Sequence, residues 1–151
     1  MGASTTRTKT SLIGSISAVA LTYESIGAGA TFPISPVFSS LGVAQRVFLS
    51  IHITPPLLSV IPIKLLILFS TDAAGLCRSQ QFKEIVLTDV MSDTAYMKMI
   101  DITSDMQGLS YISVQVVNPY AVALPVYLEL IADEGFFFQI PLLPGLVLMM
   151  N

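Results

Sequence analysis

Ionised side chains are scarce in this 151-residue chain. Asp, Glu, Lys and Arg make up 11% of it, whereas an ordinary globular chain has about 25%. Hydrophobic residues reach 53% before glycine is counted. A domain of this length buries roughly 70% of the surface of its unfolded chain, so much apolar side chain must remain outside the core. The composition therefore indicates that copies of the chain cover one another, the alternative being a surface of Ala, Ser and Thr without charge.

Cysteine, histidine and tryptophan are nearly or wholly missing. Cys77 is alone, which excludes an intrachain disulfide and argues against a cysteine-ligated zinc site. His52 is the sole histidine, and no catalytic motif of metalloproteases, hydrolases or P-loop enzymes occurs. Without tryptophan, stacking on sugar rings is a weaker prediction than self-assembly. We therefore predict a protein that is not an enzyme and that needs no cofactor or metal.

Charge is distributed unevenly along the chain. Residues 1–70 hold four Lys or Arg against one Glu, whereas residues 71–151 hold three against nine acidic residues. The basic half of one subunit could thus meet acidic loops of another, although solvated loops explain the acids equally well. Four acids stand near one another: Asp89, Asp93, Asp101 and Asp105. They lack the spacing of an EF-hand, which favours turn residues over calcium ligands. The scattered cations do not form the basic patch that nucleic-acid binding requires.

Alternation of apolar and polar residues predicts strands along most of the chain. In residues 46–54, Val47, Leu49, Ile51 and Ile53 face one side, and His52 lies on the other. Further strands are predicted over residues 15–24, 61–70, 81–88, 97–100, 109–117 and 126–132. The strand at 109–117 has the pattern of a half-buried strand, whereas the one at 61–70 is apolar on both faces. Connections are predicted at Asn118-Pro119-Tyr120 and at Asp133-Glu134-Gly135, and Phe136 begins a third strand after 109–117 and 126–132.

These elements predict an all-β chain with one β-sandwich of jelly-roll or related Greek-key type and about eight strands. We assign residues 1–12 to an N-terminal arm, residues 13–140 to the sandwich and residues 141–151 to an apolar C-terminal tail. The apolar run 57–69 is too short for a membrane-spanning helix, which needs about 20 residues, and Pro62 and Lys64 interrupt it. We therefore expect no transmembrane insertion.

A short, charge-poor β chain with a polar N-terminal arm and an apolar tail resembles the small jelly-roll and β-sandwich structural proteins of virus and phage particles. The resemblance lies in overall character and involves no diagnostic motif. It implies a virion structural protein, a capsid or capsid-decorating subunit, that forms homo-oligomers, with a trimer favoured, and contacts other capsid proteins. The predicted location is accordingly the virion.

Contacts between subunits are expected at both termini and on the second face of two strands. The candidate interface residues are Arg7, Lys9, Leu12, Phe48, Leu66, Leu68, Leu142, Leu143, Leu146, Leu148 and Met149. Two alternatives stay open. One is a receptor-binding or glycan-binding module of a viral or phage surface appendage. The other is a small outer-membrane β-barrel, although its strands would need a polar interior-facing set.

Overall fold

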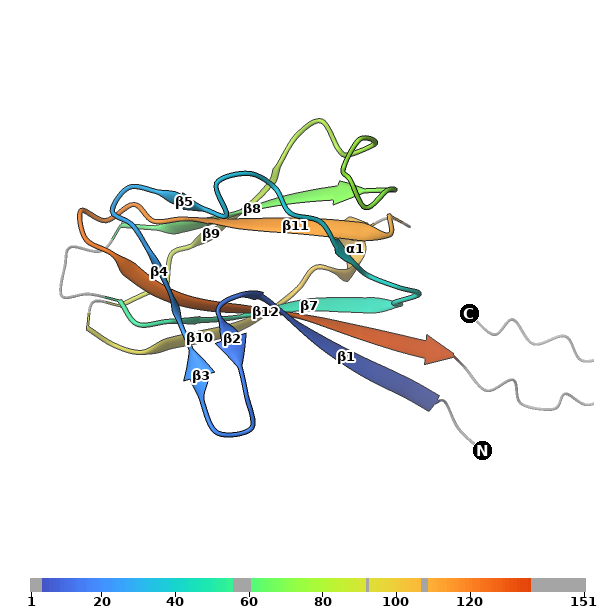
Figure 1. Cartoon of the computed structure of the whole chain (residues 1–151), viewed down its shortest axis with the longest axis horizontal. Coiled ribbons are helices and arrows are strands. Elements are labelled where there is room, and N and C mark those ends of the chain that lie inside the picture. The colour runs from blue at the N-terminus through green and yellow to red at the C-terminus, as the bar shows by residue number, and fades with distance from the viewer. Residues whose placement is uncertain (1–3, 56–60, 92, 107–108, 137–151) are drawn as a thin grey trace, which may run out of the picture.

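The computed structural model describes residues 4–55, 61–91, 93–106 and 109–136, and β-strands make up nearly all of their regular secondary structure (Figure 1). This confirms the predicted all-β class. The strands are β1 (Ser4–Ile13), β2 (Ser15–Ile16), β3 (Leu21–Thr22), β4 (Glu24–Ile26), β5 (Thr31–Phe32), β6 (Ser39–Ser40), β7 (Arg46–Ile53), β8 (Ile63–Ser70), β9 (Lys83–Leu87), β10 (Tyr96–Asp101), β11 (Tyr111–Val117) and β12 (Leu124–Phe136). A single turn of helix, α1 (Thr103–Met106), follows β10.

Ten of these strands form two five-stranded antiparallel sheets, which lie as two layers in Figure 1. The first sheet has the order β1-β12-β7-β10, with β4 also paired to β12. The second sheet has the order β5-β11-β8-β9, with β6 also paired to β11. The small β2–β3 hairpin projects beyond the first sheet on the side away from the second. Twelve strands are assigned in the described residues, against the eight or so predicted from the sequence.

One hydrophobic core fills the space between the two sheets. Its first-sheet side comes mainly from β12 and from β7, where Val47, Leu49, Ile51 and Ile53 are all at most 1% exposed. The alternating pattern of this strand is therefore confirmed. The opposing side comes from β8 and β11, whose alternate Ile, Leu and Val side chains join the same cluster. Burial of these apolar side chains, at about 1.5 to 3 kcal/mol each, is what holds the layers together.

The second sheet is covered on both sides along β11, which corrects the prediction of a half-buried strand. Ser113 and Gln115, expected on a solvated face, are 1% and 5% exposed. The reason is a loop that crosses this face: the Gln115 side-chain amide donates to the carbonyl oxygen of Pro33 at 2.9 Å. In β8, predicted to be apolar on both faces, the outward-facing Leu68 is likewise buried at 3% exposure.

The predicted turn at Asp133-Glu134-Gly135 is wrong, because these residues continue β12. Two neighbouring strands pair with this stretch: Asp133 lies opposite Arg7 of β1 on one side and opposite Arg46 of β7 on the other. These two arginines flank the Asp133 carboxylate, which lets the strand continue through this stretch. The connection at Asn118-Pro119-Tyr120 is where the sequence placed it, between β11 and β12.

The N-terminal region also differs from the sequence interpretation. Residues 4–12, assigned to an arm, form most of β1, and β1 pairs along its whole length with residues 128–136 of β12. The single strand predicted over residues 15–24 is instead the β2–β3 hairpin followed by the start of β4. A tight turn at residues 17–20 reverses the chain within this segment. The backbone amide of Ser17 donates to the Ala20 carbonyl at 2.8 Å, and the Ser17 hydroxyl accepts from the Ala20 amide. The predicted tail at 141–151 lies outside the described residues.

Candidate interaction surface

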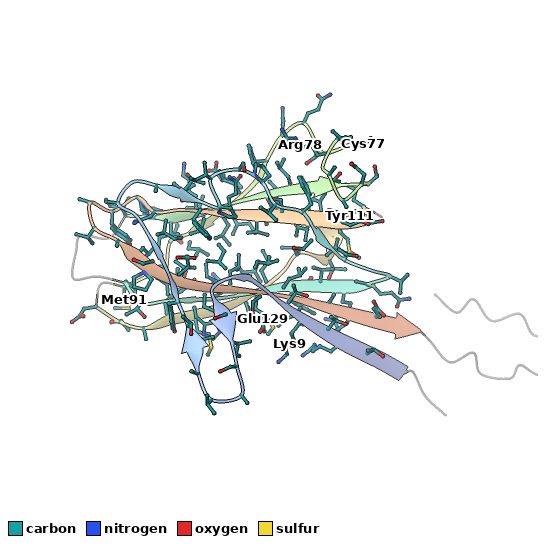
Figure 2. The ribbon with its side chains drawn as sticks, viewed as in Figure 1. Lys9, Cys77, Arg78, Met91, Tyr111 and Glu129 are labelled. Atoms are coloured by element: carbon teal, nitrogen blue, oxygen red, sulfur yellow. The ribbon has the colours of Figure 1, made fainter. Side chains whose placement is uncertain are left out.

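Four strands of the first sheet have side chains that face away from the second sheet, and we call this layer the outer face; its members from β12 are buried, and the exposed ones lie mostly on β1 and β10. The outer face comprises Arg7, Lys9 and Ser11 from β1, Tyr127, Glu129, Ile131 and Asp133 from β12, Arg46, Phe48, Ser50 and His52 from β7, and Met97, Met99 and Asp101 from β10. Figure 2 shows Lys9 and Glu129 on this side, pointing away from the second sheet. The strand pairing arranges these side chains in rows that run across the strands.

An ion pair closes one end of the outer face. Arg7 donates from Nε to one carboxylate oxygen of Asp133 at 2.7 Å and from Nη2 to the other at 2.9 Å. Such two-point geometry makes this pair stronger than an ordinary surface contact. The hydrogen bonds from Arg7 hold the pKa of Asp133 below its ordinary value, and Asp133 raises the pKa of Arg7. The pair fixes β1 against β12 at this end.

A buried polar network lies at the centre of the same face. Tyr127, only 1% exposed, donates its hydroxyl to a carboxylate oxygen of Glu129 at 2.8 Å. The hydroxyl of Ser11, from β1, is 2.9 Å from the same tyrosine oxygen. Burial raises the pKa of Tyr127; Glu129 adds to this rise, whereas Ser11 opposes it. Three residues on two strands are thus tied together, and none of them carried a recognisable motif in the sequence.

The only histidine of the chain sits beside this network in a structural setting. The His52 ring packs edge-on against Tyr127 with centroids 5.7 Å apart, and its Nε2 is 3.3 Å from the Ser50 hydroxyl. Ser50 and Glu129 are both buried, whereas His52 itself is half-buried. Phe48 lies one row away, with the Arg46 guanidinium 5.1 Å from its ring centroid.

Both edges of the first sheet are exposed. In the part of the chain that the structure describes, β1 pairs only with β12 and with no strand on its other side. Its residues 6–11 are all exposed. At the opposite edge, β10 pairs only with β7 among the described strands, and its outward Met97 and Met99 are 71% and 55% exposed. Unpaired edges of this kind are templates for adding a strand from another chain.

Of the interface residues predicted from the sequence, Arg7, Lys9 and Phe48 come together on the outer face. Leu12 is half-buried against the core instead. Leu66 and Leu68 lie in the second sheet, and Leu68 is buried within its own chain, so it offers no surface to a partner. The other five lie outside the described residues: Leu142, Leu143, Leu146, Leu148 and Met149. The exposed methionines of β10 were missed, although their spacing of two residues was visible.

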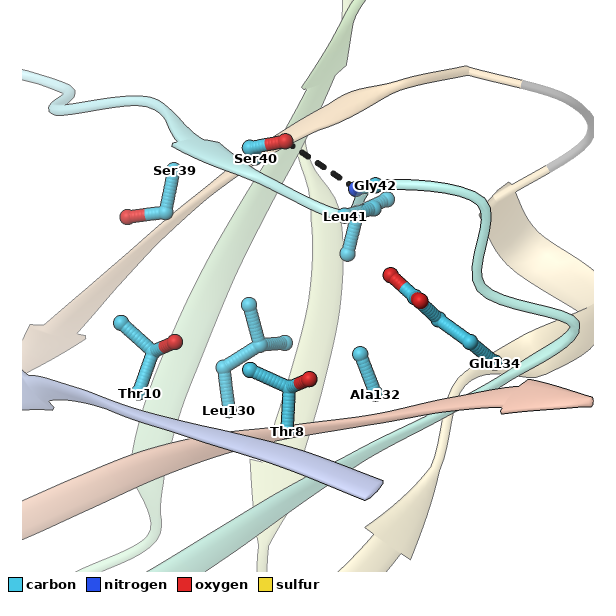
Figure 3. Close-up of a pocket in the computed structure, with 9 residues that line it drawn as sticks. All are labelled: Thr8, Thr10, Ser39, Ser40, Leu41, Gly42, Leu130, Ala132 and Glu134. Atoms are coloured by element: carbon cyan, nitrogen blue, oxygen red, sulfur yellow. Dashed lines mark hydrogen bonds between the residues drawn. The ribbon is translucent and has the colours of Figure 1, made fainter. Parts of the chain in front are cut away.

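A pocket of about 470 Å³ opens beside β1, between the two layers (Figure 3). Leu130 and Ala132 of β12 line one side of the pocket together with Thr8 and Thr10 of β1, and the buried Leu41 lies on the opposite side beside Ser39 and Ser40 (Figure 3). Among the described residues that line it, Glu134 alone is ionisable. The hydrogen bond drawn in Figure 3 runs from the Gly42 amide to the Ser40 hydroxyl at 3.0 Å.

Three of the four acidic residues considered as calcium ligands have other partners, Asp105 through an ion pair with Lys83 at 3.4 Å. Asp89 accepts from the Tyr96 hydroxyl at 2.8 Å and from Lys98 at 3.3 Å, and its pKa is lowered chiefly by Tyr96. Asp101 accepts from the Thr103 amide at 2.9 Å, capping α1. Within the described ranges, no three metal-ligating side chains are grouped together. The same residues contain no helix that is long and apolar enough to cross a membrane.

Comparison with known proteins gives little beyond this geometry. No protein-family model matches the sequence, and no curated protein matches it. Among solved structures, the chain is similar to a subunit of Bacillus endospore appendages, described as a novel family of disulfide-linked pili. The match covers 91% of each chain with a TM-score of 0.40 and 9% sequence identity. A TM-score at this level does not establish a shared fold.

Proposed function

We propose that this protein is a non-enzymatic structural subunit that assembles with copies of itself. The observation that carries the proposal is the pair of exposed edges of the first sheet. The ten-residue β1 lies on one side and β10, with its exposed methionines, on the other. Soluble monomers blunt long edge strands, because unpaired backbone N–H and C=O groups recruit strands from other chains. Pairing with another copy would satisfy those groups and cover the apolar methionine side chains.

We further propose a jelly-roll topology. The two short strands β5 and β6 pair with opposite ends of β11 and can be counted as one interrupted strand. Leaving aside β4 and the β2–β3 hairpin, eight strands then remain. The first sheet reads β1-β12-β7-β10 and the second reads β5/β6-β11-β8-β9. This order supports the double Greek key that is common in viral capsid domains.

On that basis the proposed role is that of a capsid or capsid-decorating subunit in a virus or phage particle. Rigid antiparallel sheets suit a shell component, and repeated contacts between identical subunits suit closed symmetry such as a trimer. The proposal extends to contacts with other capsid proteins and to a place on the virion. The proposal rests on the strand order and on the exposed edges of the first sheet, and it invokes no catalytic residue.

The test is the mass of the purified chain in solution, measured by sedimentation velocity from micromolar to millimolar concentration. Self-assembly predicts a weight-average mass that rises above the 16.2 kDa of one chain as concentration increases. Electron microscopy of the largest species would then separate closed rings or shells from other arrangements. A monomer at every concentration would overturn the proposal.

A further inference from the structure

We infer that β1 of one copy pairs antiparallel with β10 of a second copy, so that the first sheets of neighbouring subunits join edge to edge. This inference rests on the proposed function and gives it a specific contact. The occupant of each edge is a second copy of the chain, and the contact is heterologous, since the two surfaces that meet are different.

The strand order makes this pairing geometrically natural. Adjacent strands of the first sheet are all antiparallel, from β1 through β12 and β7 to β10. A second copy placed beside the first in the same orientation therefore presents its β10 antiparallel to β1. In the joined sheet every strand is then antiparallel to both of its neighbours, as in an ordinary antiparallel sheet.

The rows of the outer face bring opposite charges together at that junction. Lys9 lies opposite Ile131, Ile131 opposite Phe48, and Phe48 opposite Asp101. Extending this row into the next copy puts the neighbour's Asp101 directly beside Lys9. Neither residue belongs to an ion pair among the described residues, and both are exposed. The pKa of Asp101 is lowered, chiefly by the side chain of Thr103, so its carboxylate is ionised at neutral pH.

The neighbouring rows fit the same register. On the outer face, Ser11 shares a row with Met99, so the exposed methionine of the second copy would lie against β1. On the inner side, Thr10 shares a row with Ile100. Thr10 also lines the pocket beside β1 (Figure 3), and the arriving strand would cover the open side of that pocket.

Pairing of β1 with the β1 strand of a second copy is disfavoured by charge. Arg7 and Lys9 point to the same face, so a two-fold antiparallel contact centred between them would set the Lys9 of each copy beside the Arg7 of the other; Asp133 offsets each Arg7, but Lys9 would gain no acidic partner. A heterologous contact avoids this. It leaves one free β1 and one free β10 at the ends of any open assembly, so it produces a ring when the rotation closes and a helical filament when it does not.

Intermolecular disulfide formation tests the contact directly. Lys9→Cys and Asp101→Cys are combined in a Cys77→Ser background, which removes the exposed native thiol. Within one copy the two positions are three strand spacings apart, about 14 Å. That separation exceeds the reach of a disulfide, about 7 Å between Cα atoms, whereas directly opposed residues of paired strands are about 5 Å apart. Mild oxidation is therefore expected to give a ladder of cross-linked multimers on a non-reducing gel.

Matched variants define what would overturn the inference. Lys9→Cys combined with Arg78→Cys is the control, because Arg78 lies in the loop after β8, on the far side of the second sheet (Figure 2). It is expected to give no ladder. Preferred cross-linking of Lys9→Cys to Met99→Cys would overturn the register. Absence of cross-links in a chain that still associates would overturn the contact and leave the proposed function standing. A monomer under all conditions would overturn both.

Charge reversal gives an independent readout that does not depend on oxidation. Lys9→Glu is expected to weaken association about ten-fold, since it sets two like charges side by side. Adding Asp101→Lys is expected to restore association. Arg78→Glu makes the same change in net charge away from the contact and is expected to leave association unchanged. Equal weakening by Lys9→Glu and Arg78→Glu would mean that net charge, not this contact, controls assembly.

Discussion

Replacing Tyr127 with phenylalanine tests the polar network that ties β1 to the first sheet. The substitution keeps the buried ring, including its edge-on contact with His52, and removes only the hydroxyl. Two hydrogen bonds are lost, to Glu129 at 2.8 Å and to Ser11 at 2.9 Å. Ser11 is exposed and can bond to water instead, so its loss costs little. Glu129 is buried, so its carboxylate cannot readily replace the lost hydrogen bond with one to water. Loss of a hydrogen bond to a charged group lowers the unfolding free energy by about 1.5 to 3 kcal/mol.

The assay is urea unfolding of Tyr127→Phe and wild type at a concentration where both are monomeric. We expect the midpoint to fall with an unchanged slope, because the surface exposed on unfolding stays the same. Tyr111→Phe is the control: Tyr111 is half-buried, and its hydroxyl forms no hydrogen bond to another described residue. Its unfolding free energy should stay within about 0.5 kcal/mol of wild type. A similarly small change for Tyr127→Phe would refute the stabilising role of the network.

Two further predictions concern the Arg7–Asp133 ion pair and the packing of Gly75 against the Phe38 ring. Because Arg7 lowers the pKa of Asp133 in the folded chain, the pair stabilises it fully above the unfolded pKa of about 4. That stability is lost as the pH falls from about 4 toward the lower pKa that Asp133 has in the folded chain. Asp133→Asn should therefore make the unfolding free energy fall less steeply at acidic pH. The same steepness as in wild type would contradict this. Gly75 has a φ of +74°, and a Cβ there would collide with the Phe38 ring, so Gly75→Ala should cost about 2 to 4 kcal/mol in urea unfolding. Gly29→Ala, at a φ of +66° with open space around it, should cost about 1 kcal/mol, and equal costs would show that Phe38 packing is unimportant.

The sequence predicted those strands whose burial follows the period of two. The strand at 46–54 is clear because one face is buried under the second sheet and the other carries Ser50 and His52. Prediction from the sequence failed where contacts between distant parts of the chain override local signals. Nothing local distinguishes Asp133-Glu134-Gly135 from a turn, since the cations that accompany Asp133 come from the distant positions 7 and 46. Gln115 resembles a solvated residue until the Pro33 loop covers it.

The interaction surface was predictable in part. The termini and the second faces of strands were sensible places to seek contacts, and Arg7, Lys9 and Phe48 do share the outer face. Which side chains remain available depends on coverage by loops, which sequence periodicity does not encode. Leu68 was therefore chosen although it is buried within its own chain. Met97 and Met99 were overlooked because the sequence does not identify β10 as an edge strand.

Amide hydrogen exchange, followed peptide by peptide at low and high protein concentration, is the most direct test of assembly through the edges of the first sheet. Exchange should slow with concentration in β1 and in β10, because pairing satisfies their free backbone groups. Exchange in β9, an edge strand of the second sheet, should not change. Unchanged exchange in both β1 and β10 while the mass of the protein rises would contradict the account.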